Sequence, residues 1–151
     1  CGQLGHLEAY TSATSVAQRC VEGIQAGVNS SMTEFVGRED ELTALSVFEH
    51  SEAGDEFARQ VIKDTADYLA IGITSLMHVL DPDMVVLGGA MDFGGNETES
   101  GRMFIEAIRT KVSTVTFPVL AQSTIIDFAI LGNTCGFIGA AGIARAQHGE
   151  S

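Results

Sequence analysis

Residues 80–91, which read Leu-Asp-Pro-Asp-Met-Val-Val-Leu-Gly-Gly-Ala-Met, most constrain the fold of this chain. The Asp-Pro pair cannot continue a helix, because the proline ring removes an N–H donor and pushes the preceding residue out of the α region. The apolar run 84–87 lacks alternation, which predicts a short strand covered on both faces. Gly88 and Gly89 then allow a positive φ or the close approach of a ligand.

This stretch therefore predicts the end of a helix, a buried strand, and a glycine turn at the carboxyl end of that strand. In open α/β sheets the carboxyl ends of the strands are where ligands bind, which favours a ligand-facing turn. The local sequence is equally compatible with a tight exit from the strand that contacts no ligand.

A long amphipathic helix is predicted immediately before the strand. Apolar residues recur every three or four positions from Phe57 to Leu80, a spacing typical of a helix with one buried face. Asp55 is expected to be its N-cap. Gly72 inside this helix costs about 1 kcal/mol relative to Ala, which indicates close packing against another element.

The remaining elements follow from the same kind of periodicity. Residues 7–27 predict one helix or two short ones, and residues 91–101 form a polar loop that either carries function or is a solvated turn. The further expected elements are helices at 43–50, 103–112 and 136–147 and a strand at 123–131, with Arg102, Arg109 and Lys111 on the outer side of the second of these helices. The succession of strand, helix and strand predicts a βαβ crossover with parallel strands, and hence an α/β fold.

Length and charge narrow the classes of protein. A chain of 151 residues makes one domain or one lobe of something larger, and its abrupt start at Cys1 leads us to expect a missing preceding segment. With 20 acidic against 8 basic residues the net charge is -12, so we expect neither nucleic acid nor membrane surfaces as partners. Three separated cysteines favour reduced thiols in a cytoplasmic protein.

The sequence contains no complete catalytic set. There is no Gly-x-Ser-x-Gly elbow, Walker loop or Gly-x-Gly-x-x-Gly fingerprint. Cys1, His6 and Glu8 do fall within eight residues on a glycine-rich loop, and thiolate and imidazole suit tetrahedral zinc. Two ligands are half a site, and an exposed Cys and His on a loop without metal is the alternative interpretation.

Here the sequence resembles the ROK family of bacterial sugar kinases and sugar-responsive repressors, and looks most like the ROK-type glucokinases. The zinc-and-sugar motif of that family is Cys-x-Cys-Gly-x-x-Gly-Cys-x-Glu, and residues 1–8 read Cys-Gly-Gln-Leu-Gly-His-Leu-Glu. Further matches follow in family order at residues 53–59, 80–90 and 131–141. The resemblance covers essentially the whole chain.

The resemblance implies a fold and a domain organisation. The chain would be the larger lobe of an actin-like, hexokinase-like (ribonuclease H-like) ATPase, with residues 1–151 as a single carboxyl-terminal lobe whose amino-terminal lobe is absent. The catalytic base and the phosphate loop of the family lie upstream. No catalytic residue is therefore expected in this fragment, which alone would be inactive.

The resemblance also implies site residues. Cys1 would be a ligand of structural zinc, and His6 stands where the family usually has a Cys. Glu8 would accept hydrogen bonds from sugar hydroxyls, although a carboxylate at a helix start is also favoured by the helix dipole. The nucleotide would lie against Gly88, Gly89 and Ala90, where Ala90 replaces a frequent third Gly.

The function implied is transfer of a phosphoryl group from ATP, with Mg, to a hydroxyl of a hexose, glucose being the first choice. The alternative is the sugar-binding body of a ROK-type transcriptional repressor, with a helix-turn-helix module upstream. A binding or assembly module without catalysis is a third possibility. Family members commonly associate through this lobe, so a homodimer is expected.

Overall fold

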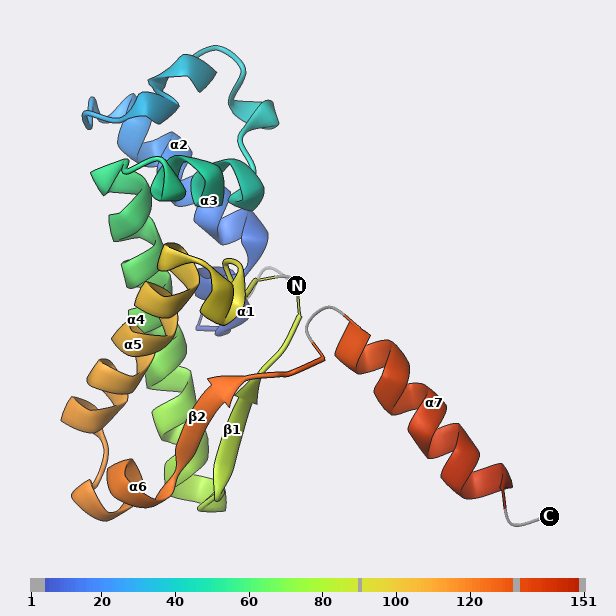
Figure 1. The fold of residues 1–151 in the computed structure, drawn as a ribbon. Coiled ribbons are helices and arrows are strands. Elements are labelled where there is room, and N and C mark those ends of the chain that lie inside the picture. The colour runs from blue at the N-terminus through green and yellow to red at the C-terminus, as the bar shows by residue number, and fades with distance from the viewer. Residues whose placement is uncertain (1–4, 90, 132–133, 150–151) are drawn as a thin grey trace.

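The computed structural model describes residues 5–89, 91–131 and 134–149. Its helices pack around one long central helix, α4, with a small sheet at one side and the last helix standing apart (Figure 1). The elements are α1 (Glu8–Thr11), α2 (Ala13–Gln25), η1 (Ser31–Phe35), η2 (Glu39–Glu41), α3 (Ala44–Glu52), α4 (Glu56–Leu80), β1 (Met84–Leu87), η3 (Gly95–Glu97), α5 (Glu99–Val115), α6 (Pro118–Ser123), β2 (Ile125–Phe128) and α7 (Cys135–His148).

The predicted α4 is confirmed at both ends. Asp55 is its N-cap, and the helix stops at Asp81, which takes a left-handed conformation with φ 47° before Pro82. The close approach expected at Gly72 is also confirmed, because a Cβ there would lie 2.5 Å from the side chain of Leu7. The absence of a side chain at Gly72 thus lets the segment that precedes α1 lie against α4.

Among the described residues the sheet consists of β1 and β2, which pair in parallel with Met84 opposite Ile125 and Leu87 opposite Phe128. The predicted parallel βαβ arrangement is therefore confirmed, although β2 is shorter than the predicted 123–131. The inward-facing Val85 packs against the core.

The prediction that β1 is covered on both faces is wrong for this structure. Met84 and Val86 are 48% and 53% exposed, and Ile125 of β2 is 58% exposed. The core packs against one face of the sheet only, so alternate residues point to solvent. An unbroken apolar run records what a strand can bury, but it does not say whether a second layer is present.

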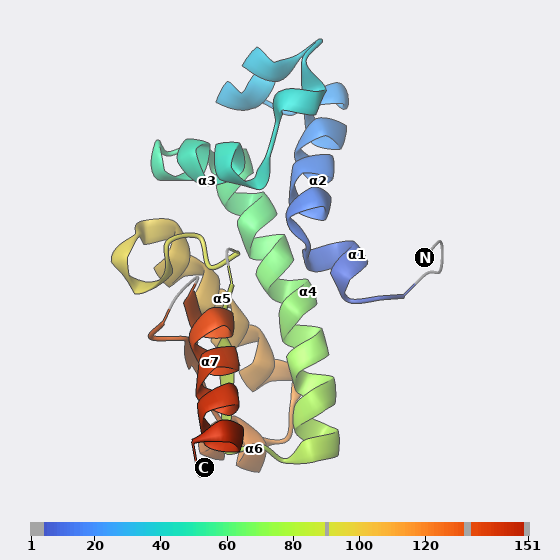
Figure 2. The same cartoon turned by 90° about the vertical axis from the view of Figure 1, so that its right-hand side faces the viewer.

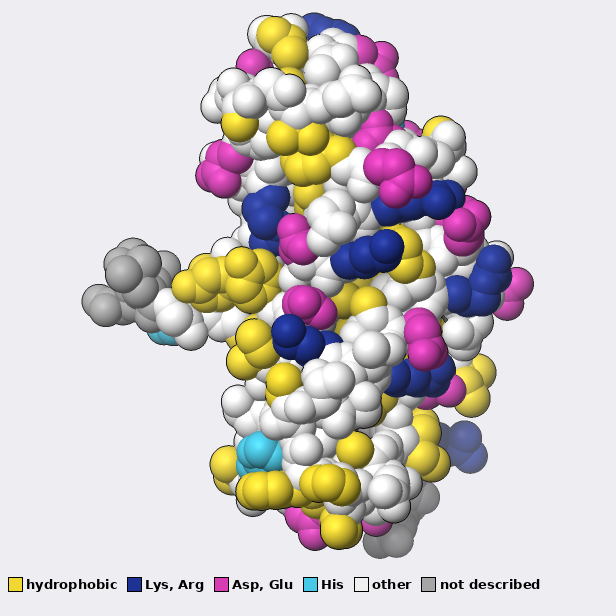
Figure 3. All heavy atoms as spheres, turned by 90° about the vertical axis from the view of Figure 1, so that its left-hand side faces the viewer, with side chains coloured by type: hydrophobic (Ala, Val, Ile, Leu, Met, Phe, Trp, Pro, Cys, Tyr) yellow, Lys and Arg dark blue, Asp and Glu magenta, His cyan; other side chains and the backbone are white. Residues whose placement is uncertain are grey.

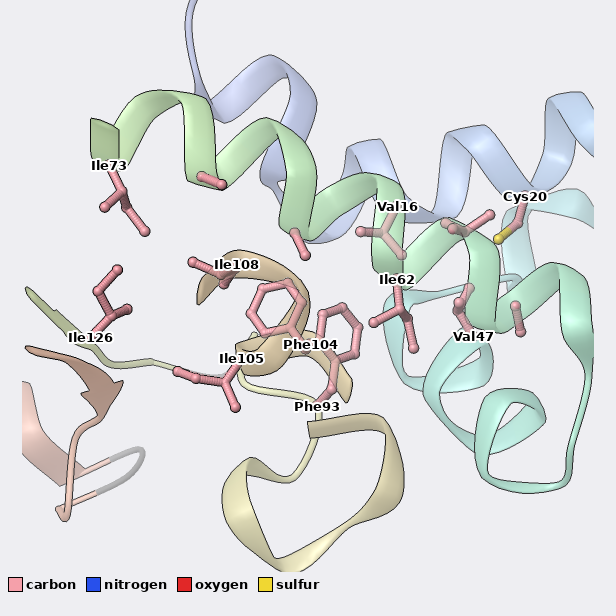
Figure 4. Close-up of a cluster of buried hydrophobic side chains, with 14 of the residues drawn as sticks. Val16, Cys20, Val47, Ile62, Ile73, Phe93, Phe104, Ile105, Ile108 and Ile126 are labelled. Atoms are coloured by element: carbon pink, nitrogen blue, oxygen red, sulfur yellow. The ribbon is translucent and has the colours of Figure 1, made fainter. Parts of the chain in front are cut away.

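The core lies mainly between α4 and α5, which run side by side (Figures 1 and 2). Ile62 of α4 and Ile108 of α5 are fully buried there, and Phe93 meets Phe104 edge to face at 5.0 Å (Figure 4). Val16 and Cys20 of α2 and Val47 of α3 extend the same cluster along the amino-terminal part of α4, away from Ile73. Burial raises the pKa of the Cys20 thiol to about 12, an effect that Arg19 opposes, so this thiol is protonated at neutral pH.

Ion pairs tie the exposed sides of α4 and α5 together. Arg59 of α4 lies 3.0 Å from Glu99 of α5, and Lys111 of α5 lies 3.5 Å from Asp67 of α4. On the face shown in Figure 3, basic side chains are interspersed with acidic ones. Arg109 is exposed, as predicted for the outer side of α5, and its guanidinium also donates to the backbone carbonyl of Ile126, which links α5 to β2.

The last helix, α7, projects away from the rest of the molecule (Figures 1 and 2). Its apolar residues Phe137 and Ile143 are 81% and 63% exposed. Within the described residues, no helix has both the length and the hydropathy needed to cross a bilayer.

Asp55 links the start of α4 to the loop at Ser30 and Ser31. Its carboxylate accepts hydrogen bonds from the backbone N–H of Ala58 at 2.9 Å and of Ser31 at 2.5 Å, and from the hydroxyls of both serines. Burial disfavours the charged form, but these donors outweigh it and lower the pKa of Asp55 to about 2. The charged carboxylate therefore stabilises the fold.

We expect Asp55→Asn to lower the free energy of unfolding by roughly 1–2 kcal/mol at neutral pH, with solvent screening taken into account. The folded pKa lies below the unfolded value of about 3.9, so this stabilisation is present above about pH 4 and is lost as the pH falls through about 2. Urea unfolding across this range measures it. The exposed Asp40→Asn is the control, and equal losses for both variants at neutral pH would contradict the expectation.

Candidate functional site

Glu8 opens α1, the short helix that follows the sequence motif at residues 1–8. Its side chain is exposed, and its backbone carbonyl accepts hydrogen bonds from Ser12 N at 3.0 Å and from the hydroxyl of Ser15 at 3.3 Å. The carboxylate is therefore accessible to a ligand while the backbone that carries it is held. The same position also suits the alternative role of Glu8 as an acidic residue in the first turn of a helix.

Only part of the predicted metal site falls within the described residues. His6 is exposed and lies in the loop before α1, whereas Cys1 lies outside the described residues. Across residues 5–89, 91–131 and 134–149, no group of three or more His, Cys, Asp or Glu side chains is arranged to hold a metal ion. The described residues therefore do not form a zinc site by themselves.

The glycine turn follows β1 as predicted. Gly89 has φ 106°, a conformation that a side chain would strain, and a Cβ built there meets no described atom within 4 Å. Gly88 is exposed, and Ala90 lies outside the described residues. The turn thus offers an open backbone surface at the carboxyl end of a parallel strand.

A cavity of about 370 Å³ lies just beyond this turn. Its walls are largely apolar and are formed by Ala13, Thr43, Ala44, Leu45, Phe48, Met91, Phe93 and Gly94. The loop after the turn forms one wall, and α3 with the start of α2 forms the others. A cavity of this size and character is typical of small-molecule sites.

The loop at residues 91–101 is not simply a solvated polar turn. Phe93 is 4% exposed, has φ 50°, and packs on Phe104 of the core, and Gly95 is also buried. The isolated aromatic residue in a polar stretch was the only signal of this burial in the sequence. The buried Phe93 fixes the loop that borders the cavity.

Two buried hydroxyls and an exposed carboxylate hold the start of α5 against the end of α3. The hydroxyls of Ser51 and Ser100 lie 2.6 Å apart, both fully buried, and Glu52 accepts a hydrogen bond from Ser100 N at 2.7 Å. Hydrogen bonds from Ser100 hold the pKa of Glu52 below its usual range. Arg59 donates to the carbonyl of Ser51 and closes the network.

The structure brings the two predicted sequence segments together. A second cavity, of about 250 Å³, is lined by Thr11 at the end of α1 and by Gly88 of the glycine turn, with Leu69 and Phe104 among the residues beneath them. Residues 77 positions apart in the sequence therefore line one cavity. The segment that carries Glu8 and the glycine turn are neighbours in space.

The comparisons with known proteins fit this arrangement. The model of the ROK family matches residues 1–147. The glucokinase of Halalkalibacterium halodurans is 30% identical over 147 residues, which are 97% of this chain and 43% of that protein. The xylose repressor of Caldicellulosiruptor bescii is 24% identical over 117 residues, which are 78% of this chain and 28% of the repressor.

A solved structure of a ROK family glucokinase from Streptomyces griseus, in complex with glucose and AMPPNP, matches with a TM-score of 0.76 at 21% identity. The match covers 97% of this chain and 46% of that one. The predicted fold class, α/β of the actin-like and hexokinase-like kind, is thereby confirmed. The chain spans less than half the length of these proteins.

Proposed function

Because this chain belongs to the ROK family, we propose that it is the carboxyl-terminal lobe of a sugar kinase that transfers the γ-phosphoryl group of ATP to a hydroxyl of a hexose, glucose first. The observation that supports the proposal is the cavity that Thr11 and Gly88 both line, because the sugar would lie near the segment of Thr11 and the nucleotide near the turn of Gly88. Phosphoryl transfer needs these two substrates to lie close together.

Each predicted site residue would have a separate role in binding the substrates. The carboxylate of Glu8 would accept hydrogen bonds from sugar hydroxyls, for which its exposed position at the start of α1 is suited. Gly88, Gly89 and Ala90 would contact the nucleotide, and the apolar cavity beside Met91 would take its base. ATP would arrive with Mg²⁺, which neutralises phosphate charge.

The chain would not act alone. The catalytic base and the phosphate loop would be supplied by the preceding lobe, so residues 1–151 by themselves should be inert. Cys1 and His6 would hold a structural zinc ion only together with further ligands from that lobe. We also propose a cytoplasmic homodimer in which this lobe contacts neither membrane nor nucleic acid, in keeping with its net charge of -12.

The similarity to the xylose repressor supports a second candidate, the sugar-binding body of a transcriptional repressor. Glu8 would bind sugar in that case too, but no phosphoryl group would be transferred. The two functions therefore share the sugar site and differ in turnover.

The test is an ATP-dependent phosphorylation assay of the whole protein with glucose, fructose, mannose and N-acetylglucosamine. For the preferred sugar we expect Glu8→Gln to raise KM roughly tenfold or more, because hydrogen bonds to a charged acceptor contribute about 1.5–3 kcal/mol. Glu106→Gln, an exposed site on α5, is the matched control.

Each outcome of this assay is informative. Turnover with a weakened Glu8→Gln variant supports the kinase and the assigned role of Glu8. Sugar binding without turnover on any sugar would favour the repressor. Turnover that Glu8→Gln leaves unchanged would remove Glu8 from the sugar site.

A further inference from the structure

Resting on the proposed role of Glu8, we propose that Arg19 is the positioning residue of the sugar site. Arg19 lies on α2 and does not contact the proposed ligand position itself. Its guanidinium joins three helices and fixes α1, the helix that carries Glu8. The sugar site would thus depend on a residue eleven positions further along the chain.

The hydrogen bonds of Arg19 define this clamp. Nη1 donates to the backbone carbonyl of Tyr10 on α1 at 2.6 Å, and Nη2 donates to the hydroxyl oxygen of Thr65 on α4 at 2.5 Å. Thr65 is 1% exposed, and its hydroxyl donates to the carbonyl of Val61 at 2.7 Å, so the acceptor is itself held in place. The planar guanidinium of Arg19 therefore bridges a rigid part of α4 and the backbone of α1.

Two aromatic rings complete the clamp. Tyr10 and Tyr68 lie with ring centroids 5.1 Å apart, and Cζ of Arg19 lies 5.6 Å from the centroid of the Tyr68 ring. The guanidinium thus contacts the ring of α4 against which the ring of α1 rests. A lysine could supply the charge but not the two diverging donors.

The helix α1 is too short to be stable without tertiary contacts. The four residues of α1 form a single turn, which is not stable in isolation, and each of them is exposed or half-buried. Its location is set by contacts with other parts of the chain. Arg19 donates to the carbonyl of Tyr10, and the hydroxyl of Ser15 donates to the carbonyls of Glu8 and Ala9. Leu7, just before α1, lies against Gly72 of α4. Release of Tyr10 would therefore loosen Glu8, two residues away.

The surroundings of the Arg19 guanidinium also support a positioning role. Within the described residues no carboxylate lies at ion-pairing distance from it, although the chain has 20 acidic residues. Its Nε is buried and has no hydrogen-bond partner among the described groups. The guanidinium is thus used for the geometry of its neutral acceptors rather than for an ion pair.

The chain contains its own reporter of this geometry. It has no Trp, and its two tyrosines are Tyr10 and Tyr68. The near-ultraviolet circular dichroism and emission of tyrosine therefore come entirely from the pair that Arg19 holds. A change in the position of α1 relative to α4 can be read without any label.

The experiment compares Arg19→Met and Arg19→Lys with the parent chain. We expect Arg19→Met to lose roughly half of the near-ultraviolet tyrosine signal and to weaken D-glucose binding, measured by calorimetry, roughly tenfold, since small displacements of a binding group are costly. Arg19→Lys should fall between. Arg38→Met is the matched control, because Arg38 also lies over a ring, that of Phe35, and should change neither signal.

A double-mutant cycle separates positioning from general structural support. If Arg19 acts through Glu8, adding Arg19→Met to Glu8→Gln should weaken glucose binding no further. Additive losses, or an unchanged tyrosine signal in Arg19→Met, would overturn the proposal. If the unmodified chain binds no sugar, either alone or within the whole protein, the proposed function has failed. The tyrosine signal then still decides whether Arg19 clamps α1.

Discussion

Replacing Gly101 with Ala is expected to lower the free energy of unfolding by about 3 kcal/mol. A Cβ at this position would lie 1.9 Å from the carbonyl oxygen of Gly95 and 2.7 Å from its carbon and nitrogen. These are backbone atoms, so no side chain can swing aside. The loss should appear even though Ala favours a helix by about 1 kcal/mol over Gly.

The same substitution should also affect the cavity proposed to take the nucleotide base. The loop that Gly101 admits contains Phe93 and Gly94, which line that cavity, so displacement of the loop would alter its shape. Urea unfolding with circular dichroism measures the stability. Gly142→Ala on α7, where a Cβ meets no described atom within 4 Å, is the control and should be neutral or stabilising by up to about 1 kcal/mol. Equal effects of the two variants would contradict the assigned contact.

Truncating Ile108 to Ala is expected to cost about 3–4 kcal/mol. Its side chain is fully buried between α4 and α5 (Figure 4), and its removal would leave a void that the two helices can only partly close. Because Leu69 of α4 and Phe104 of α5 line the same cavity as Gly88, the loss would also loosen the candidate site.

Two controls frame this prediction. Ile108→Val removes a single methyl group and should cost about 0.5–1.5 kcal/mol. Ile130→Ala removes as many atoms as Ile108→Ala from a side chain that is fully exposed, and should change stability by less than about 0.5 kcal/mol. A cost for Ile108→Ala no greater than for Ile130→Ala would show that the helix pair does not form the core.

The elements predicted correctly are those that are specified by residues close together in the sequence. The apolar period of α4, the cap at Asp55 and the Asp-Pro stop are each set by residues within a few positions of one another. The burial of Phe93 and the hydrogen bonds from Arg109 to Ile126 could not be predicted, because each depends on a partner elsewhere in the fold. The coverage of β1 failed for a similar reason, since a strand does not encode which layers surround it.

The site shows the same division. Glu8 and the glycine turn stood out because their residue types carry chemistry, and the resemblance to a family located them. The cavity that Thr11 of α1 and Gly88 of the glycine turn both line depends on the packing of α1 on α4, which no spacing in the sequence reveals. Arg19 was missed because a half-buried helical arginine looks like any other, and its acceptors at Tyr10 and Thr65 are chosen by the tertiary fold.

The one-sided packing of the sheet bears on how the chain can be handled. Among the described residues β1 pairs only with β2, so its other edge presents a row of backbone donors and acceptors next to the exposed Met84 and Val86. Such an edge is a template for strand addition, and at high concentration copies would join edge to edge into larger aggregates. Binding measurements on the isolated chain should therefore be made dilute and fresh, with light scattering as a guard against slow precipitation.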